Sequence, residues 1–126
     1  MDFRRENPAH GPIVRGFVGN GFRVNDRVFA RGVLLDPQEA LAWDAPASVD
    51  ALTAADMAGL LALDPLPEFL LLGTGPRLAR PPRAFVAALE AQGIGVEAMD
   101  SRAAARAWGV LRQEERWICA ALMPLA

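Results

Sequence analysis

The sequence predicts a single α/β domain on three observations. A chain of 126 residues, 52% of them apolar, has the size and composition of one globular domain. Between Ile13 and Ala45, turn signals are dense and the apolar residues are of the β type. After Thr53, helical and strand periods alternate. We expect residues 12–126 to form the domain and residues 1–11 to be a short flexible tail.

The first half is predicted to be an antiparallel meander. The strings IVRGFVG and FRV flank Asn20-Gly21, a favoured two-residue hairpin turn. Asn25-Asp26 then bends the chain again before RVFARGVLL. After Asp36-Pro37, the string EALAWDA is either a fourth strand or a short helix, and we favour the strand.

The second half is predicted to alternate between helices and strands. Thr53-Ala-Ala-Asp56 has the form of a capping box and opens a helix. Pro81-Pro82 opens the next helix, and Gly93 stands where that helix ends. Strand, helix and strand joined by short loops imply right-handed parallel crossovers. We expect helices at 54–63, 82–92 and 101–111, and strands at 68–72, 94–98 and 116–123.

This topology predicts a binding groove at one edge of the sheet, because parallel strands bring their carboxyl-end loops to the same rim. Glycines there let backbone N–H groups approach a ligand, two hydroxyls supply hydrogen bonds, and an acid or an arginine fixes polarity. Alternatively, the glycines only satisfy turn geometry, while Asp100 or Ser101 caps the following helix. The residues predicted to line the groove are Gly73, Thr74, Gly75, Asp100, Ser101 and Arg106.

The GTG loop fails as a nucleotide fingerprint, so we expect no cofactor. It lacks the G-x-x-x-x-G-K-[ST] pattern, Leu78 replaces the third glycine of G-x-G-x-x-G, and Pro76 removes one backbone donor. Arg77, Arg80 and Arg83 beside a helix N-terminus leave a small-anion site open. We favour the other interpretation, a solvated arginine loop paired with surface carboxylates.

Composition excludes several chemistries. The only histidine, His10, lies in the tail, which removes a catalytic triad and a histidine metal pair. The only cysteine, Cys119, sits mid-strand and is expected to be buried packing. All thirteen basic residues are arginine, so Schiff-base chemistry has no lysine. A net charge of −2 argues against nucleic acid, and no apolar run approaches the ~20 residues that span a bilayer. With no signal or transit peptide visible, we expect a cytoplasmic protein.

Three segments resemble a known family. LLLGTG, GIGVEAMDSRAAARAWGVL and ERWICAAL follow one another as in the domain of unknown function 498 family, and the resemblance covers about residues 12–123. That family includes a mitochondrial respiratory complex I assembly factor and many bacterial and archaeal members. The resemblance implies a three-layer α/β/α-type sandwich with a mixed central sheet and an added N-terminal β-hairpin or meander. The family typically has Thr where this chain has Ser101, and it often reads R-T-Y-N where this chain has Arg106-Ala107-Trp108-Gly109. The loss of Thr, Tyr and Asn argues against a polar role for that turn.

Two functions remain open. The first is a non-enzymatic protein-interaction or assembly-factor-like module of a bacterial cytoplasm, with another protein as its partner. The alternative is a small-molecule or anion-binding domain, or an enzyme of unknown reaction, that uses the rim cleft. The absence of His, Lys and Tyr from the rim removes the commonest general bases and favours the first function.

Overall fold

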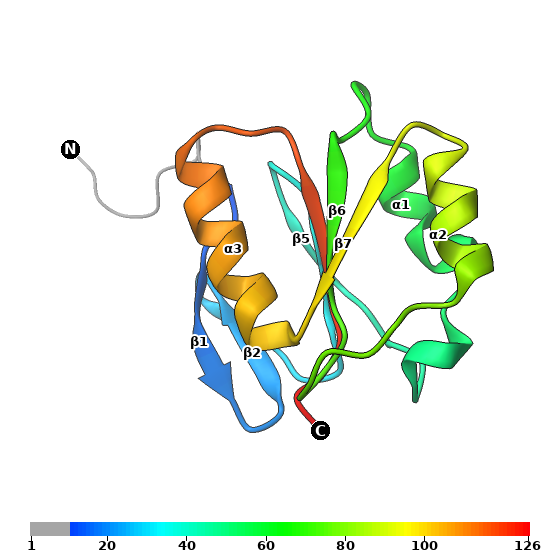
Figure 1. Cartoon of the computed structure of the whole chain (residues 1–126). Coiled ribbons are helices and arrows are strands. Elements are labelled where there is room, and N and C mark those ends of the chain that lie inside the picture. Colours follow the sequence, from blue (N-terminus) through cyan, green and yellow to red (C-terminus); the bar gives the residue numbers. More distant parts are fainter. Residues whose placement is uncertain (1–10) are drawn as a thin grey trace.

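The computed structural model describes residues 11–126, so the predicted tail lies outside the described residues except for Gly11, which is buried. The chain forms a three-stranded sheet of order β1-β2-β3 and a five-stranded sheet of order β5-β4-β8-β6-β7 (Figure 1). The strands are β1 (Val14–Val18), β2 (Gly21–Val24), β3 (Arg27–Phe29), β4 (Val33–Leu35), β5 (Ala40–Ala42), β6 (Phe69–Gly73), β7 (Gly95–Met99) and β8 (Cys119–Leu122). The helices are the 3-10 turns η2 (Val49–Ala51) and η3 (Ala54–Met57), then α1 (Ala58–Leu61), α2 (Arg83–Glu90) and α3 (Ser101–Gln113).

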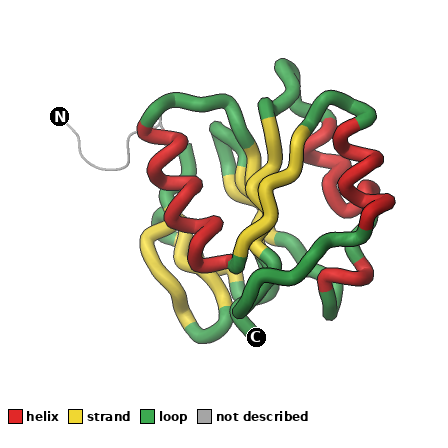
Figure 2. The backbone as a smooth tube through the Cα atoms, in the orientation of Figure 1, coloured by secondary structure: helices red, strands yellow, loops and turns green. Residues whose placement is uncertain are grey.

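The molecule has three layers, as predicted, with the central sheet in the middle. Helices α1 and α2 cover one face, whereas α3 and the small sheet cover the other (Figure 2). Strand β6 is buried on both faces: Leu70 and Leu72 pack in one core cluster, and Leu71 packs in the other. The fold is therefore the predicted α/β sandwich with a mixed sheet.

The second half follows the predicted crossovers. Strand β6 pairs in parallel with β7 on one side and with β8 on the other. The first helix opens with the predicted capping box, in which the Thr53 N–H donates to the Asp56 carboxylate at 2.9 Å. It starts as the 3-10 turn η3 and becomes α-helical only at Ala58. Strand β6 includes Gly73, which the sequence placed in the loop.

The first half is not one continuous meander, which corrects the prediction. Strands β1, β2 and β3 form the small sheet, whereas β4 pairs with β8 and β5 in the central sheet. The reason is burial: all three residues of β4, Val33–Leu35, are buried, so this strand needs cover on both faces. The first hairpin turn is also one residue earlier, at Gly19-Asn20, because Gly19 takes the left-handed conformation with φ +59°. The second turn, at Asn25-Asp26, is as predicted.

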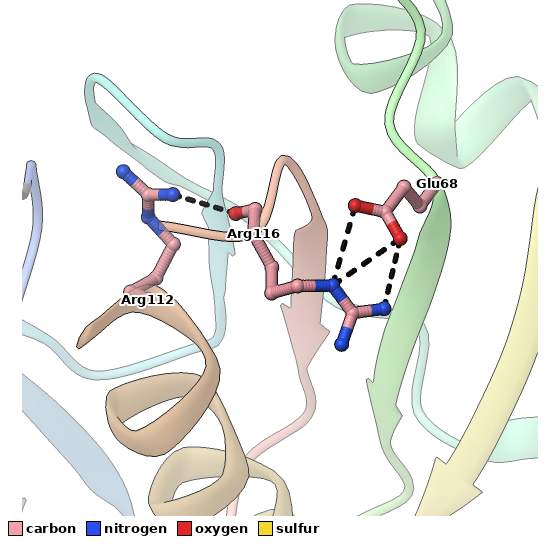
Figure 3. A network of polar contacts seen from close by, with 3 residues as sticks. All are labelled: Glu68, Arg112 and Arg116. Carbon is pink, nitrogen blue, oxygen red and sulfur yellow. Dashed lines mark hydrogen bonds and ion pairs between the residues drawn. The ribbon is translucent and has the colours of Figure 1, made fainter. Parts of the chain in front are cut away.

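An ion pair joins the amino ends of β6 and β8. Arg116 donates to the Glu68 carboxylate through both Nη2, at 2.8 Å, and Nε (Figure 3). The Glu68 N–H donates to the Trp117 carbonyl. Hydrogen bonds from the Arg116 guanidinium lower the pKa of Glu68. The buried Arg112 side chain reaches from α3 and donates to the Arg116 carbonyl at 2.6 Å. These contacts hold α3 and two central strands together at the end of the sheet opposite the predicted rim.

The buried thiol of Cys119 should make the stability of the protein depend on pH. Burial, with a smaller effect from the Asp36 charge, raises the pKa of this thiol to about 12. An unfolded thiol ionises near pH 8.5, so above that pH the unfolded state binds fewer protons than the folded state. The free energy of unfolding should therefore fall from about pH 9 towards pH 12, at up to about 1.4 kcal/mol per pH unit.

The measurement is urea unfolding across this pH range, with Cys119→Ala as the control that removes the thiol and its contribution to the slope. In the folded wild type at pH 8, the thiol should not react with a disulfide reagent, and it should react fully in denaturant. Rapid labelling of the folded protein would contradict the assignment.

Candidate functional site

A single hydroxyl joins the three chain segments that meet at the rim. Ser101 is fully buried, and its Oγ accepts from the Gly75 N–H at 2.9 Å and donates to the Met123 carbonyl at 2.7 Å. The Ser101 N–H donates to the Gly75 carbonyl at 2.8 Å, and the Met123 N–H donates to Gly73 at 3.0 Å. The loops after β6, β7 and β8 are thus brought together, and Ser101 is the group that they share.

The second hydroxyl is also used internally. Thr74 is 5% exposed, and its Oγ lies 2.7 Å from the Arg77 carbonyl and accepts from the Ala79 N–H at 3.0 Å. Its N–H donates to the Met99 carbonyl at 2.9 Å, which extends the pairing with β7 one residue past the end of β6. Thr74 therefore shapes the loop that follows it and does not present a free hydroxyl to a ligand.

The other predicted residues lie apart from one another. Asp100 caps α3, its carboxylate accepting from the Ala103 N–H at 2.8 Å. Gly73 ends β6 directly beneath Ser101, where a Cβ would lie 2.7 Å from the serine Oγ. Arg106 is exposed on the second turn of α3. Gly73 and Ser101, the first residue of α3, are buried in the interior of the rim, whereas Asp100 caps the helix and Arg106 is exposed on it.

A cleft of about 450 Å³ lies beside this junction. Thr74, Gly75 and Pro76 form part of its wall together with the chain's last residues, and of the predicted set only Thr74 and Gly75 line it. The remaining wall comes from Asn20, Ala30, Arg31 and residues 44–49, an irregular segment that sequence periodicity did not single out. Its Pro46 and Ser48 were the available signals, since they mark a loop between β5 and η2.

Chemically reactive groups are scarce along the described chain. Residues 11–126 hold no cluster of three or more His, Cys, Asp or Glu side chains arranged to bind a metal ion. The Cys119 thiol is buried in β8 and its pKa is raised, so it is a poor nucleophile. In the same range of residues, no helix has both the length and the apolar character to cross a membrane.

The fold and the rim define a small α/β sandwich whose loop hydroxyls hold the sheet ends together. Residues 14–123 match the family described as protein of unknown function (DUF498/DUF598), and the chain belongs to that family. Two solved structures share the fold. A Mth938-like domain from Bordetella pertussis is 29% identical, covers 100% of this chain and 94% of its own, and superposes with a TM-score of 0.79. A Xanthomonas campestris protein is 35% identical over 99% and 93% of the chains, with a TM-score of 0.78.

Named relatives come from bacteria and vertebrates. An uncharacterised protein of Rhodobacter capsulatus is 33% identical over 112 residues, which are 89% of this chain and 84% of that protein. The NADH dehydrogenase [ubiquinone] 1 alpha subcomplex assembly factor 3 of Danio rerio is 28% identical over 98% of this chain and 71% of its own length. The protein of the same name from Bos taurus is 34% identical over 87% of this chain and 56% of its own length. The family resemblance seen in the sequence is thereby confirmed.

Removing the Ser101 hydroxyl tests the junction. In Ser101→Ala, the Gly75 N–H and the Met123 carbonyl lose a buried partner, and each unsatisfied buried group costs about 1–3 kcal/mol. We expect the free energy of unfolding, measured by urea denaturation, to fall by at least about 1 kcal/mol. The matched control is Ser48→Ala, since Ser48 is exposed and its side chain makes no capping bond. Equal stabilities of the two variants would show that the junction contributes nothing.

Adding one methyl group at Gly73 tests how closely the strand end packs. The new Cβ in Gly73→Ala would lie 2.9 Å from the Ser101 Cα and 3.0 Å from the Leu122 Cδ2, closer than carbon atoms pack. Overpacking of this kind costs about 1–3 kcal/mol. Gly95→Ala is the control within a paired strand, because its Cβ would make an ordinary 3.6 Å contact with Phe69. In thermal unfolding, the melting midpoint of Gly73→Ala should be lower than that of the wild type, and that of Gly95→Ala should not. An unchanged midpoint for Gly73→Ala would refute the packing argument.

Proposed function

We propose that this protein acts by binding another protein, as an assembly-factor-like module, and that it does not catalyse a reaction. The observation that carries the proposal is the internal use of the rim hydroxyls. Thr74 and Ser101 are both buried and bonded to backbone groups of this chain. A nucleophile or general base needs a free, reachable polar atom, which these two side chains do not offer.

The relatives support the same direction. The proteins from Danio rerio and Bos taurus carry the name of an assembly factor, and this chain matches most of its own length to each. An assembly factor acts through contacts with other proteins, so a shared fold with a rigid rim suits that role. The relative from Rhodobacter capsulatus and a single buried thiol support a bacterial cytoplasm as the setting.

The alternative function is binding of a small molecule in the rim cleft. Its support is the cleft itself, whose volume of about 450 Å³ falls within the range of ligand sites. Thr74 and Gly75 line one wall, so these two residues of the predicted groove would contact such a ligand. Arg31 lines the cleft too, but it is already paired with Asp44 at 2.8 Å.

Affinity purification separates the two functions. The tagged chain is expressed at native level in its own host, cross-linked, purified and analysed by mass spectrometry for proteins and for small molecules. We expect a defined protein to co-purify in near-stoichiometric amount, and the complex to re-form from the two purified proteins. The tag alone serves as the control. Recovery of a stoichiometric small molecule without any protein would overturn the proposal and favour the cleft alternative.

A further inference from the structure

Three neighbouring arginines form no ion pair with any acidic side chain that the structure describes. We name residues 76–83, which connect the rim to α2 and include the first residue of that helix, the arginine loop. In Figure 1 this segment runs from the lower end of β6, beside the C-terminus, across to α2. Arg77, Arg80 and Arg83 are exposed, and no carboxylate of residues 11–126 forms an ion pair with them. The expected pairing with surface carboxylates is therefore not present within the described chain.

The loop is held in one conformation. The Thr74 hydroxyl binds the loop at two points, at the Arg77 carbonyl and at the Ala79 N–H. Pro76, Pro81 and Pro82 further restrict its backbone. A partner that binds here does not have to order a flexible segment first, which lowers the entropic cost of association.

An apolar contact site lies between the arginines. Leu78 is 64% exposed, the largest exposure among the large apolar side chains of the described residues. With Arg80, Pro81 and Ala98 it lines a shallow hollow of about 400 Å³ beside the edge strand β7. The Thr74 N–H bonds to the Met99 carbonyl, so Met99 faces β6 and the peptide groups of the preceding Ala98 face outward.

The start of α2 adds no negative charge to this positive surface. Arg83 is the first residue of α2, and the first turn of that helix contains no acidic residue. The whole chain nevertheless carries a net charge of −2, so the arginine loop is a local reversal of sign. Such a surface attracts and orients a partner of opposite charge.

We propose that the arginine loop binds an acidic, extended segment of a partner protein. Carboxylates of the segment pair with Arg77, Arg80 and Arg83, and one apolar side chain packs on Leu78 and Pro81 in the hollow. The proposal rests on the function proposed above and specifies the chemistry of the partner. Arginine favours this pairing, because its planar guanidinium binds a carboxylate in bidentate fashion. The adjoining leucine favours a protein segment over nucleic acid, whose backbone presents no apolar side chain.

The direct test uses the full chain and a synthetic ligand. The ligand is a fluorescein-labelled twelve-residue peptide of Asp, Glu and Ser with one central Leu, and binding is read by fluorescence anisotropy. We expect Arg77→Gln/Arg80→Gln/Arg83→Gln to weaken binding by about tenfold, since three exposed ion pairs are lost. Leu78→Ser should weaken it severalfold, and wild-type binding should fall as salt rises. The matched control, Arg23→Gln/Arg27→Gln/Arg102→Gln, removes the same charge from other surfaces and should bind as wild type does.

Three outcomes would overturn the proposal. The first is that the wild-type protein does not bind the peptide, and the second is that the control triple variant weakens binding as much as the arginine variant does. The third is that single-stranded DNA of the same charge binds as tightly as the peptide, and that Leu78→Ser does not change the affinity for DNA. The last result would mean a general anion surface. Melting midpoints close to wild type show that each variant is folded, as expected for exposed side chains. Repeating the affinity purification with the arginine variant separates the two proposals, because a partner retained by this variant refutes the docking surface and leaves the protein-binding function intact.

Discussion

The buried hydroxyl of Ser101 is the contact on which the rim depends. Its Oγ accepts from the Gly75 N–H and donates to the Met123 carbonyl. One side chain therefore satisfies backbone groups in the segments that follow two different central strands, β6 and β8. The position needs a hydroxyl and a small volume at once, because the side chain has no exposed surface. The same crowding explains Gly73, where any Cβ would meet the serine. At the opposite end of the sheet, the exposed Arg116–Glu68 pair joins the same two strands, β6 and β8.

Local signals in the sequence were sufficient for the second half of the fold. The Thr53–Asp56 capping box forms as its spacing indicated, and Asp100 caps α3. The topology of the first half was harder to predict, because the residues of a hairpin turn do not determine which sheet the following strand joins. The three apolar residues of β4 are buried, and the strand pairs with β8 in the central sheet, where both faces are covered. Pairing between distant segments decided the topology there, and turn chemistry did not.

Parallel strands predicted that the loops after β6 and β7 would meet, as they do, but the direction of their side chains was not predictable, and a binding role for these residues stays a prediction. Parallel strands indicated that Thr74 and Ser101 would approach one another, and their loops are hydrogen-bonded. Whether a hydroxyl faces solvent or the interior depends on acceptors far away in sequence, such as the Met123 carbonyl for Ser101. No local pattern encodes that geometry. The cleft wall at residues 44–49 escaped prediction for a related reason, since irregular segments carry no periodicity.

The GTG loop connects the interior of this protein to its surface. Its hydroxyl is unavailable to a ligand because it binds the Arg77 carbonyl and the Ala79 N–H, and those same bonds fix the backbone from which Arg77, Leu78 and Arg80 project. A hydroxyl that the sequence placed in a binding groove therefore acts through the loop it orders. Charge then acts over a longer range than the hydrogen bonds that position it, out to a Debye length of about 10 Å at moderate salt. Within residues 11–126, arginines without an ion pair flank an exposed leucine on this ordered loop. This is the charge and the apolar contact that the proposed docking of an acidic segment needs, and such docking requires no reactive group.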